Sequence, residues 1–352
     1  MNKIGIISLA FLMIFLLCAC AAYEFYEFPA EEMLDVEEEP VVEEVGDWVE
    51  GNDSAEIEHE ADDFPQEPLE GLNIHGLLSR VEYGNNVVYI FGSMHYGRSS
   101  WYPLHPEVEA AMRRADVFAF ETDVSPEGQL EVAPALASYM LLDGITLSEF
   151  LDEETYEHFM AIIETYGISS PSIERFTPWV ISVMLAEMAY HEAGISSTYG
   201  IDFYVKDFAN AHNLPILYLN PLEHEISLAF GLPDYLQHYA ALSIPDFETS
   251  VREVESLVHA YEIQDIEQIT TLARQDLLTS ETLNPLEEYI IDVIVIQRSI
   301  EFAQEMIRYL QETAPPTTFF VTMGIGHMVG DDYGNVFNYL MSAGFEVVPL
   351  YR

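Results

Sequence analysis

Cysteine and lysine are the residue types that this sequence most nearly lacks. The chain of 352 residues contains 2 cysteines, Cys18 and Cys20. A domain that follows them therefore has no disulfide bond, no cysteine nucleophile and no metal held by thiolates. Positive charge is scarce as well, because 12 Lys and Arg residues face 61 Asp and Glu residues, for a formal net charge of −49. Such a chain repels a polyanion, so we expect no nucleic-acid partner.

Several motifs that mark large enzyme classes are also missing. The sequence has no G-x-S-x-G nucleophile elbow, no Walker loop, no H-E-x-x-H zinc motif and no dinucleotide-binding glycine fingerprint. Hydrophobic residues make up 49% of the chain, which is enough for a sizeable core. Any chemistry must therefore come from residues that the fold brings together.

The N-terminus is typical of an export signal that ends in a lipidation site. Lys3 precedes an apolar run from Ile4 to Leu17, shorter than the roughly 20 residues that span a bilayer. Together with the following Cys18-Ala19-Cys20, the end of this run resembles a bacterial lipobox, in which the last cysteine is lipidated. We therefore predict a signal peptide over residues 1–19 and an extracytoplasmic bacterial lipoprotein held to the membrane through Cys20. An ordinary signal peptide or a short membrane anchor is the alternative.

An acidic segment follows the predicted lipidation site. From Tyr23 to Glu70 the sequence is rich in Asp and Glu, has no Lys or Arg and shows no steady apolar period. This composition predicts a self-repelling, disordered tether over residues 20–70. An acidic arm that binds a partner is the alternative. The folded domain is expected over residues 71–352.

Buried strands are predicted at both ends of this domain. A turn at Tyr83–Asn86 favours a hairpin, and short apolar runs favour further strands. The predicted strands are Ile74–Glu82, Val87–Phe91, Val117–Phe120, Pro215–Leu219, Thr317–Thr322 and Phe345–Leu350.

The middle of the chain is predicted to be mostly helical. Ser148–Tyr166 is amphipathic, and Phe247–Ser280 and Pro285–Thr313 are typical of long single helices. The sequence therefore predicts an α/β fold, with a mixed central sheet that carries strand-GxxH units at both ends and a helical insertion between them.

Two histidines follow predicted strands in the same way. They end the segments Gly92-Ser93-Met94-His95 and Gly324-Ile325-Gly326-His327, and Glu121 ends a third strand. Ligands of α/β sheets bind beyond the carboxyl ends of strands, so these side chains are expected to meet over one site. Imidazole and carboxylate together suit Zn, Mn, Co or Fe(II), and such a site with an open position activates water.

The glycines beside these histidines form part of the same hypothesis. Gly92, Gly324 and Gly326 are expected to let the backbone turn sharply and to let a substrate approach closely. A tight turn without a ligand, or a nest of backbone N–H groups for an anion, is the alternative for Gly324–Gly330.

The charged candidates each have a structural interpretation as well. A histidine after a strand can be a hydrogen-bonded structural residue, and Glu121 can cap a helix or pair with Arg98. Asp202 begins a predicted helix and is by default a capping carboxylate. Arg298 lies on an apolar helix, which predicts pairing with a buried acid or binding of a substrate carboxylate.

Three other histidines carry less weight. His75 lies in the predicted hairpin, His105 precedes Pro106 and is expected to open a helix, and His224 lies in a loop or helix start that can reach the site.

Four segments of this domain resemble the TraB/GumN family in consistent order, over roughly Gly71 to Arg352. They are Phe91–His95, Trp101–Leu104, Ala115–Asp123 and Met323–Asp332. The family is related to the Tiki proteins, metal-dependent proteases with paired GxxH motifs, and its fold resembles that of erythromycin esterases and the ChaN haem-binding proteins.

The resemblance implies a surface-anchored metalloprotease or related hydrolase with a peptide or protein substrate. His95, Glu121 and His327 would hold Mn, Co or Zn, and Glu121 would act as ligand or general base. If Glu121 is a ligand, Asp202, Glu223 or Glu225 would have to help. The alternative is a non-catalytic lipoprotein that captures a peptide signal or a haem-like ligand in the same cleft.

The sequence departs from the family at two positions. The family often has an acid where this chain has Asn220, and Glu223 or Glu225 is the substitute within reach along the chain. It favours Arg-Asn where this chain has Arg298-Ser299. Both departures concern accessory roles rather than the three proposed metal residues.

The lipobox hypothesis predicts that Cys20→Ser releases the protein from membranes or leaves it unprocessed, because no acyl chain can then be attached. Membrane fractionation and the mass of the mature N-terminus measure this. A variant that is still cleaved and still fractionates with membranes contradicts lipidation at Cys20.

Overall fold

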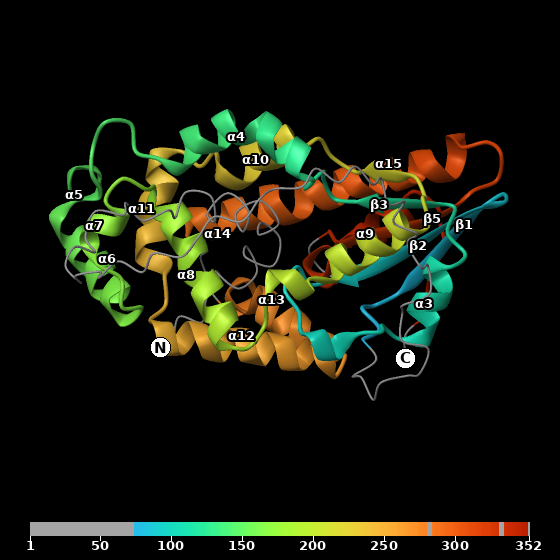
Figure 1. Cartoon of the computed structure of the whole chain (residues 1–352), viewed down its shortest axis with the longest axis horizontal. Helices are drawn as coiled ribbons and strands as arrows, with labels where there is room; N and C mark the ends of the chain where they lie inside the picture. The colour runs from blue at the N-terminus through green and yellow to red at the C-terminus, as the bar shows by residue number, and fades with distance from the viewer. Residues whose placement is uncertain (1–73, 280–283, 331–333, 351–352) are drawn as a thin grey trace, which may run out of the picture.

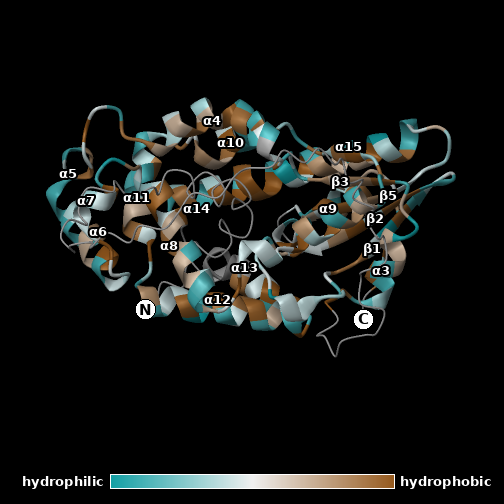
Figure 2. Ribbon diagram, in the orientation of Figure 1, coloured by the Kyte–Doolittle hydropathy of each residue, from teal (hydrophilic) through white to brown (hydrophobic). Residues whose placement is uncertain are grey.

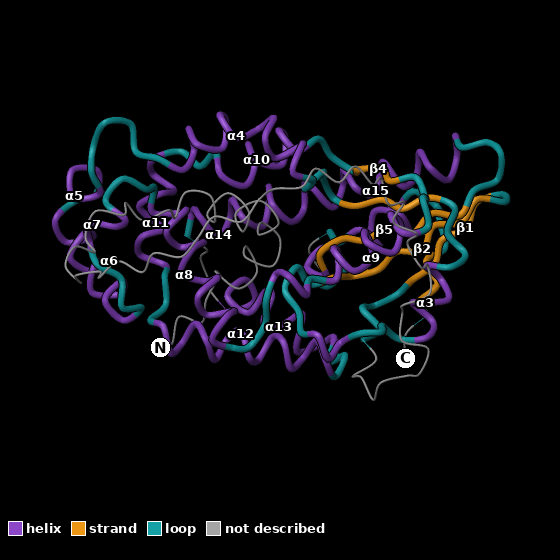
Figure 3. The backbone as a smooth tube through the Cα atoms, in the orientation of Figure 1, coloured by secondary structure: helices purple, strands orange, loops and turns teal. Residues whose placement is uncertain are grey.

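A computed structural model describes residues 74–279, 284–330 and 334–350 of the chain. The predicted signal peptide, Cys20 and the acidic tether lie outside these ranges. The strands gather at one end of an elongated molecule, and most helices lie at the other (Figures 1 and 3). None of the helices in the described ranges is both long and apolar enough to cross a bilayer.

The strands form one mixed sheet of six, in the order β4-β3-β5-β2-β1-β6. The four strands β4, β3, β5 and β2 are parallel, and β1 pairs antiparallel with both β2 and β6. This is the mixed sheet that the sequence predicts. The strand bounds are β1 Ser79–Tyr83, β2 Asn86–Ser93, β3 Val117–Phe120, β4 Ile216–Tyr218, β5 Thr318–Gly324 and β6 Val347–Pro349.

Helices fill most of the remaining described chain. Between β2 and β4 they are α3 Pro106–Met112, α4 Pro126–Met140, α5 Leu147–Phe150, α6 Glu153–Thr165, α7 Ser170–Ile173, α8 Pro178–Glu192 and α9 Ile201–Ala211. After β4 they are α10 Leu222–Phe230, α11 Asp234–Ser243, α12 Phe247–Glu262, α13 Ile266–Thr279, α14 Pro285–Tyr289, α15 Arg298–Glu312 and α16 Val336–Ser342. A π-helix, Ile290–Gln297, joins α14 to α15, and short 3₁₀ turns span Ser99–Trp101, Ser197–Tyr199 and Ile325–His327.

The sheet order explains how motifs from opposite ends of the domain meet. Strand β5 comes late in the chain but inserts between β2 and β3, so its neighbours are both early strands. Ser93 lies in register with Gly324, and Ala119 with Val321. The carboxyl ends of β2, β3 and β5 therefore share one edge at the centre of the sheet, and each candidate side chain follows one of these ends.

Helices cover both faces of the sheet. Phe319 and Phe320 are consecutive on β5, so their side chains point to opposite faces. Phe319 stacks on Tyr309 of α15, with ring centroids 4.9 Å apart. Phe320 contacts Phe118 at 5.6 Å, and Phe118 in turn contacts Phe208 of α9 at 5.8 Å. Thus α15 and α9 lie on opposite faces of the sheet.

The helical insertion packs on itself away from the sheet. Helix α8 contacts α11 and α12, and α10 contacts α4. Brown and teal alternate along surface helices such as α12 (Figure 2), which is typical of amphipathic helices with one buried face. Buried side chains of the insertion and of the sheet belong to one continuous core.

Several predicted elements end or break where local geometry demands it. The strand expected from Ile74 begins only at Ser79, because Gly76 and Leu77 both have φ of 52°. The helix expected over Ser148–Tyr166 is two helices, since Asp152 caps α6 by accepting a hydrogen bond from the Thr155 amide at 2.9 Å.

The other differences lie in the insertion. The single helix expected over Phe247–Ser280 is divided into α12 and α13, with Gln264 between them at φ of 59°. Helices α4, α10 and α11 were not assigned by the sequence pattern. Helix α4 has Pro134 in its interior and only a weak apolar stripe, so its period is hard to recognise.

Two glycines allow backbone segments to meet behind the candidate site. A Cβ at Gly92 would lie 2.9 Å from both the Gly76 carbonyl oxygen and Met328 Sδ. A Cβ at Gly200 would lie 2.2 Å from the carbonyl oxygen of His95. Gly200 therefore fixes the distance between the start of α9 and the backbone that carries His95.

We expect Gly200→Ala to destabilise the fold by roughly 3 kcal/mol, because the added methyl group meets backbone that cannot rotate away. Urea unfolding measures the change. Gly344→Ala is the matched control: nothing lies within 4 Å of its Cβ, so only its φ of 93° opposes the change, at a cost of about 1–2 kcal/mol. An equal or smaller loss at Gly200 contradicts the packing role.

Candidate functional site

His95 is buried and held by the first turn of α9. Its Nδ1 lies 2.8 Å from Asp202 Oδ2, and Asp202 Oδ1 accepts a hydrogen bond from the Ser93 hydroxyl at 2.9 Å. The amide of Ile201 donates to the Met94 carbonyl at 3.1 Å, which docks α9 on the strand end. Nε2 of His95 is buried and has no hydrogen-bond partner. Gly200 is the residue that caps α9, so Asp202 orients His95 instead of capping the helix.

His327 is arranged in the same way by a different helix. It ends the 3₁₀ turn after β5 and is fully buried, with its ring 4.9 Å from that of Phe302. Its Nδ1 lies 2.9 Å from the Ser299 hydroxyl of α15. Its Nε2 is also buried and without a hydrogen-bond partner. Both histidines thus use Nδ1 for positioning and leave Nε2 available.

Glu121 follows the end of β3, beside the turn after β5 that carries His327. Its Oε1 accepts a hydrogen bond from the Gly324 amide at 2.6 Å, and its Oε2 accepts one from Arg298 at 2.5 Å. The carboxylate therefore joins β3 to the turn after β5 and to α15. Its partner is Arg298 rather than Arg98, which instead pairs with Glu262 at 3.0 Å.

Arg298 is buried together with a second acid. Its Nε lies 2.6 Å from Glu225 Oε2 of α10. Asn220, just after β4, donates hydrogen bonds to Glu225 and Glu301 at 2.7 Å each. Arg298 therefore pairs with buried acids, as its place on an apolar helix predicts.

The remaining candidates on α10 differ in how deeply they are buried. Glu225 is the acid that joins the buried network, whereas Glu223 is exposed on α10. His224 contacts Glu301 at 3.1 Å, at the outer edge of the network.

The two histidines have opposite electrostatic surroundings. Burial opposes protonation of His95, but the adjacent Asp202 carboxylate outweighs it and raises the pKa of His95 above its usual value. Burial and the nearby Arg298 guanidinium lower the pKa of His327 to about 3. Charges on His95 and Glu121 also act on His327, which agrees with their convergence at one sheet edge.

Glu121 stays ionised in spite of its burial. Desolvation favours its neutral form, but Arg298 and the two histidines together with the Gly324 amide hold the pKa of Glu121 at about 2. At neutral pH it is therefore a fixed negative charge. A carboxylate of such low pKa is a weak proton acceptor.

The donor set fits a divalent cation in part. A histidine that binds a metal characteristically gives its other ring nitrogen to a carboxylate or similar acceptor. His95 and His327 both have that arrangement, with buried and unpartnered Nε2 atoms. The carboxylate of Glu121, by contrast, is directed to Arg298 and Gly324. The three side chains thus share one buried region, while the role of Glu121 as a ligand stays a prediction.

A different group has closely spaced metal-binding atoms. Among the residues that the structure describes, His75, His105 and Glu107 are the one set of three whose ligand atoms lie within 4.8 Å of one another. His75 Nε2 lies 2.9 Å from Glu107 Oε2, and the rings of His75 and His105 are 4.4 Å apart. The protein therefore has a possible His/Glu metal-binding cluster near the start of α3.

Sequence reasoning missed this group because its parts are ordinary when taken singly. His105 caps α3 by accepting a hydrogen bond from the Glu107 amide, which agrees with its predicted place at the helix start. The pattern His105-Pro106-Glu107 was visible. Only the fold brings His75, some 30 residues earlier, against it.

Gly92, in the first histidine segment, has a packing role that differs from the expected one. Gly92, Gly324 and Gly326 all lie outside the left-handed region of φ. At Gly92 the close neighbours are Gly76 and Met328, so protein atoms occupy the space that was expected to admit a substrate. The Gly324 amide is used by Glu121.

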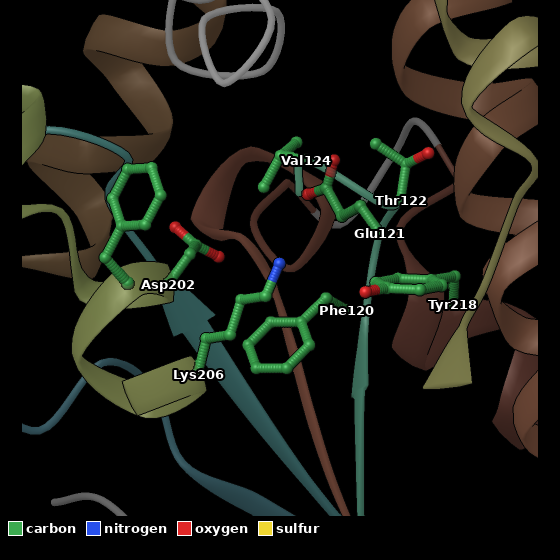
Figure 4. Close-up of a pocket in the computed structure, with 8 residues that line it drawn as sticks. Phe120, Glu121, Thr122, Val124, Asp202, Lys206 and Tyr218 are labelled. Atoms are coloured by element: carbon green, nitrogen blue, oxygen red, sulfur yellow. The ribbon is translucent and has the colours of Figure 1, made fainter. Parts of the chain in front are cut away.

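A small pocket adjoins the Asp202 and Glu121 carboxylates (Figure 4). It is small, with enclosed room for about one water molecule. Its lining comes from the end of β3, the first turns of α9 and the end of β4: Phe120, Glu121, Thr122, Val124, Asp202, Phe203, Lys206 and Tyr218. Of the buried site residues, Glu121 and Asp202 line this pocket, and His95 and His327 do not.

Comparison with known proteins places these features in a family. The model of the TraB/PrgY/gumN family matches residues 77–349. The chain belongs to this family. Its relatives include the uncharacterised protein YbaP of Escherichia coli K12 and that of Shigella flexneri. Each is 23% identical over 253 residues, which cover 70% of this chain and 86% of the relative. No solved structure matches the chain.

The match to the TraB/PrgY/gumN family covers both histidine segments, β3 with Glu121, and Arg298. It confirms the family expected from the sequence. The pairing of Arg298 with Glu121 and Glu225 can be tested by substitution.

We expect Arg298→Met to destabilise the protein by roughly 3–5 kcal/mol, because Glu121 and Glu225 are then left buried without a cation. Urea unfolding at pH 7 measures the loss. The deficit should shrink as the pH falls towards 4, since protonated carboxyl groups tolerate burial.

Arg252→Met is the matched control, because its pair with Glu248 is exposed and contributes less than about 1 kcal/mol. Equal losses in the two variants, or a deficit at Arg298 that does not depend on pH, contradict the buried network.

Proposed function

We propose that this protein is a metal-dependent hydrolase that cleaves peptide bonds, held outside the cytoplasmic membrane of a bacterium by lipid on Cys20. The acidic segment over residues 20–70 serves as the tether of the TraB/PrgY/gumN domain. The substrate is a peptide or protein. Family membership and the residues at the centre of the sheet support the proposal.

One observation carries the proposal. Two histidines from distant parts of the chain lie at neighbouring strand ends, each with Nδ1 held by a polar partner and Nε2 buried without one. A buried imidazole nitrogen without a partner is costly unless a ligand uses it. A divalent cation such as Mn, Co or Zn suits two imidazoles near a carboxylate, and its binding to His95 would displace any proton on Nε2.

His95 and His327 would hold such a cation, which would polarise the peptide carbonyl and lower the pKa of water for attack on it. The protein's own residues prepare this site. Asp202 fixes the ring of His95 and holds the proton of Nδ1, so that Nε2 can donate its lone pair. Ser299 does the same for His327.

Glu121 contributes fixed negative charge to this arrangement. With a pKa of about 2 it stays ionised, and its hydrogen bonds to Gly324 and Arg298 hold it in place. We therefore assign Glu121 to charge balance at the cation rather than to general base catalysis. We assign proton transfer to Asp202 instead, since it lines the pocket and contacts His95.

The test uses the full-length protein in detergent, a diverse peptide pool and mass spectrometry of the fragments. After chelation, added Mn²⁺, Co²⁺ or Zn²⁺ should restore cleavage. His327→Ala should lower it by at least roughly 100-fold, and Ser299→Ala should weaken metal binding about 10- to 100-fold. His158→Ala, an exposed histidine on α6, is the control and should retain activity.

Two results contradict the proposal in different ways. Peptide binding that survives chelation and yields no new fragments favours capture without turnover. Metal-restored cleavage that is unchanged in His327→Ala, but lost in His75→Ala, places the cation at the cluster near α3 instead.

A further inference from the structure

Lys206 has an unusual position in so acidic a protein. It is the one lysine in the described ranges, in a chain with 61 Asp and Glu residues. It lies on α9 four residues after Asp202, so both side chains project from the same face of the helix. That face meets the edge of the sheet where His95 and Glu121 lie.

The side chain of Lys206 extends into the pocket beside the candidate site. Figure 4 shows its nitrogen directed into the space between Asp202 and Glu121. The side chain is 17% exposed, so most of it packs against the pocket wall. Phe120, Phe203 and Tyr218 supply the apolar part of the lining.

The acids around Lys206 are largely occupied by other donors. Both Asp202 oxygens are used by Ser93 and His95, and both Glu121 oxygens by Gly324 and Arg298. The ion pair of Lys206 is with Asp123 Oδ1 at 3.9 Å, which is beyond hydrogen-bond distance.

Asp123 has closer partners than Lys206. It accepts a hydrogen bond from the Ser125 amide at 2.9 Å and another from Tyr218, and these bonds together with Lys206 lower its pKa although partial burial opposes the shift. The Lys206 ammonium can therefore donate to a ligand without breaking a short protein contact.

We propose that Lys206 binds a carboxylate group of the peptide substrate, in the pocket next to the proposed cleavage site. This inference rests on the proposed function and adds the substrate class: peptides with a carboxylate close to the scissile bond. A net charge of −49 disfavours anionic ligands at most of the surface. The ammonium group of Lys206 offers a local exception, and its hydrogen bond to a carboxylate is charge-assisted.

The carboxylate has two sources, the C-terminus of a peptide or the side chain of Asp or Glu. Both present the same group to Lys206. The two sources predict different responses to simple changes in the peptide.

The test compares wild type with Lys206→Met, which keeps the length of the side chain, and Lys206→Arg, which keeps its charge. Arg252→Met removes an exposed positive charge elsewhere and is the control. Full-length protein in detergent is given matched fluorescent peptides: free acid against C-terminal amide, and Glu against Gln beside the cleavage site. Binding is measured by anisotropy with Mn²⁺ present, and KM and kcat by fragment analysis.

We expect Lys206→Met to weaken binding and raise KM by roughly 10-fold or more for carboxylate peptides only. Lys206→Arg should retain most of the affinity, and kcat should change little. If Lys206→Met lowers the affinity for the free acid relative to the amide only, the ligand group is the peptide C-terminus. If it lowers the affinity for the Glu peptide relative to the Gln peptide only, the ligand group is a side chain.

The proposal is overturned if wild type does not distinguish the matched peptides, or if Lys206→Met weakens all of them equally. Binding and cleavage separate this inference from the proposed function. Binding that depends on the peptide carboxylate, without fragments, supports the role of Lys206 and contradicts the hydrolase. Cleavage that is the same for carboxylate and neutral peptides supports the hydrolase and contradicts the role of Lys206. Thermal unfolding of each variant shows whether a general loss of structure accounts for weaker binding.

Discussion

The buried guanidinium of Arg298 is the interaction on which the rest of the site depends. It is 3% exposed and lies between the carboxylates of Glu121 and Glu225. A buried charge is tolerated only when it is paired and hydrogen-bonded. This requirement ties three separate parts of the chain together: the end of β3, helix α10 and the start of α15. Because Glu121 also accepts from the Gly324 amide, the turn that carries His327 is fixed by the same charge pair.

The π-helix before α15 helps to place these contacts. Its eight residues, Ile290–Gln297, end directly before Arg298 and Ser299. These two consecutive residues contact different partners, Arg298 reaching Glu121 and Ser299 reaching His327. π-helical turns often occur at functional sites, since they shift the face that following residues present. Here the shift precedes the two side chains that organise the site.

The arrangement of the site could be predicted from the sequence where it follows from the backbone. The sequence predicted that the strands before His95 and His327 end at one edge, and β2 and β5 are neighbouring parallel strands whose carboxyl ends lie together. The partners of those residues could not be predicted. Asp202 looked like a helix cap, and its contact with His95 depends on how α9 docks beside β2. The split of Phe247–Ser280 depends on one left-handed residue, Gln264, which has no strong local signal.

The buried network explains why an amide rather than an acid suits position 220. The resemblance to the family led us to expect a carboxylate at this position, whereas Asn220 donates its amide hydrogens to Glu225 and Glu301. A carboxylate at residue 220 would place a third negative charge against those two, with Arg298 as the nearest buried cation. The amide instead satisfies both acids without adding charge. The departure therefore preserves the pairing of Arg298 with Glu121 and Glu225, and with it the geometry that brings His95 and His327 to one edge of the sheet.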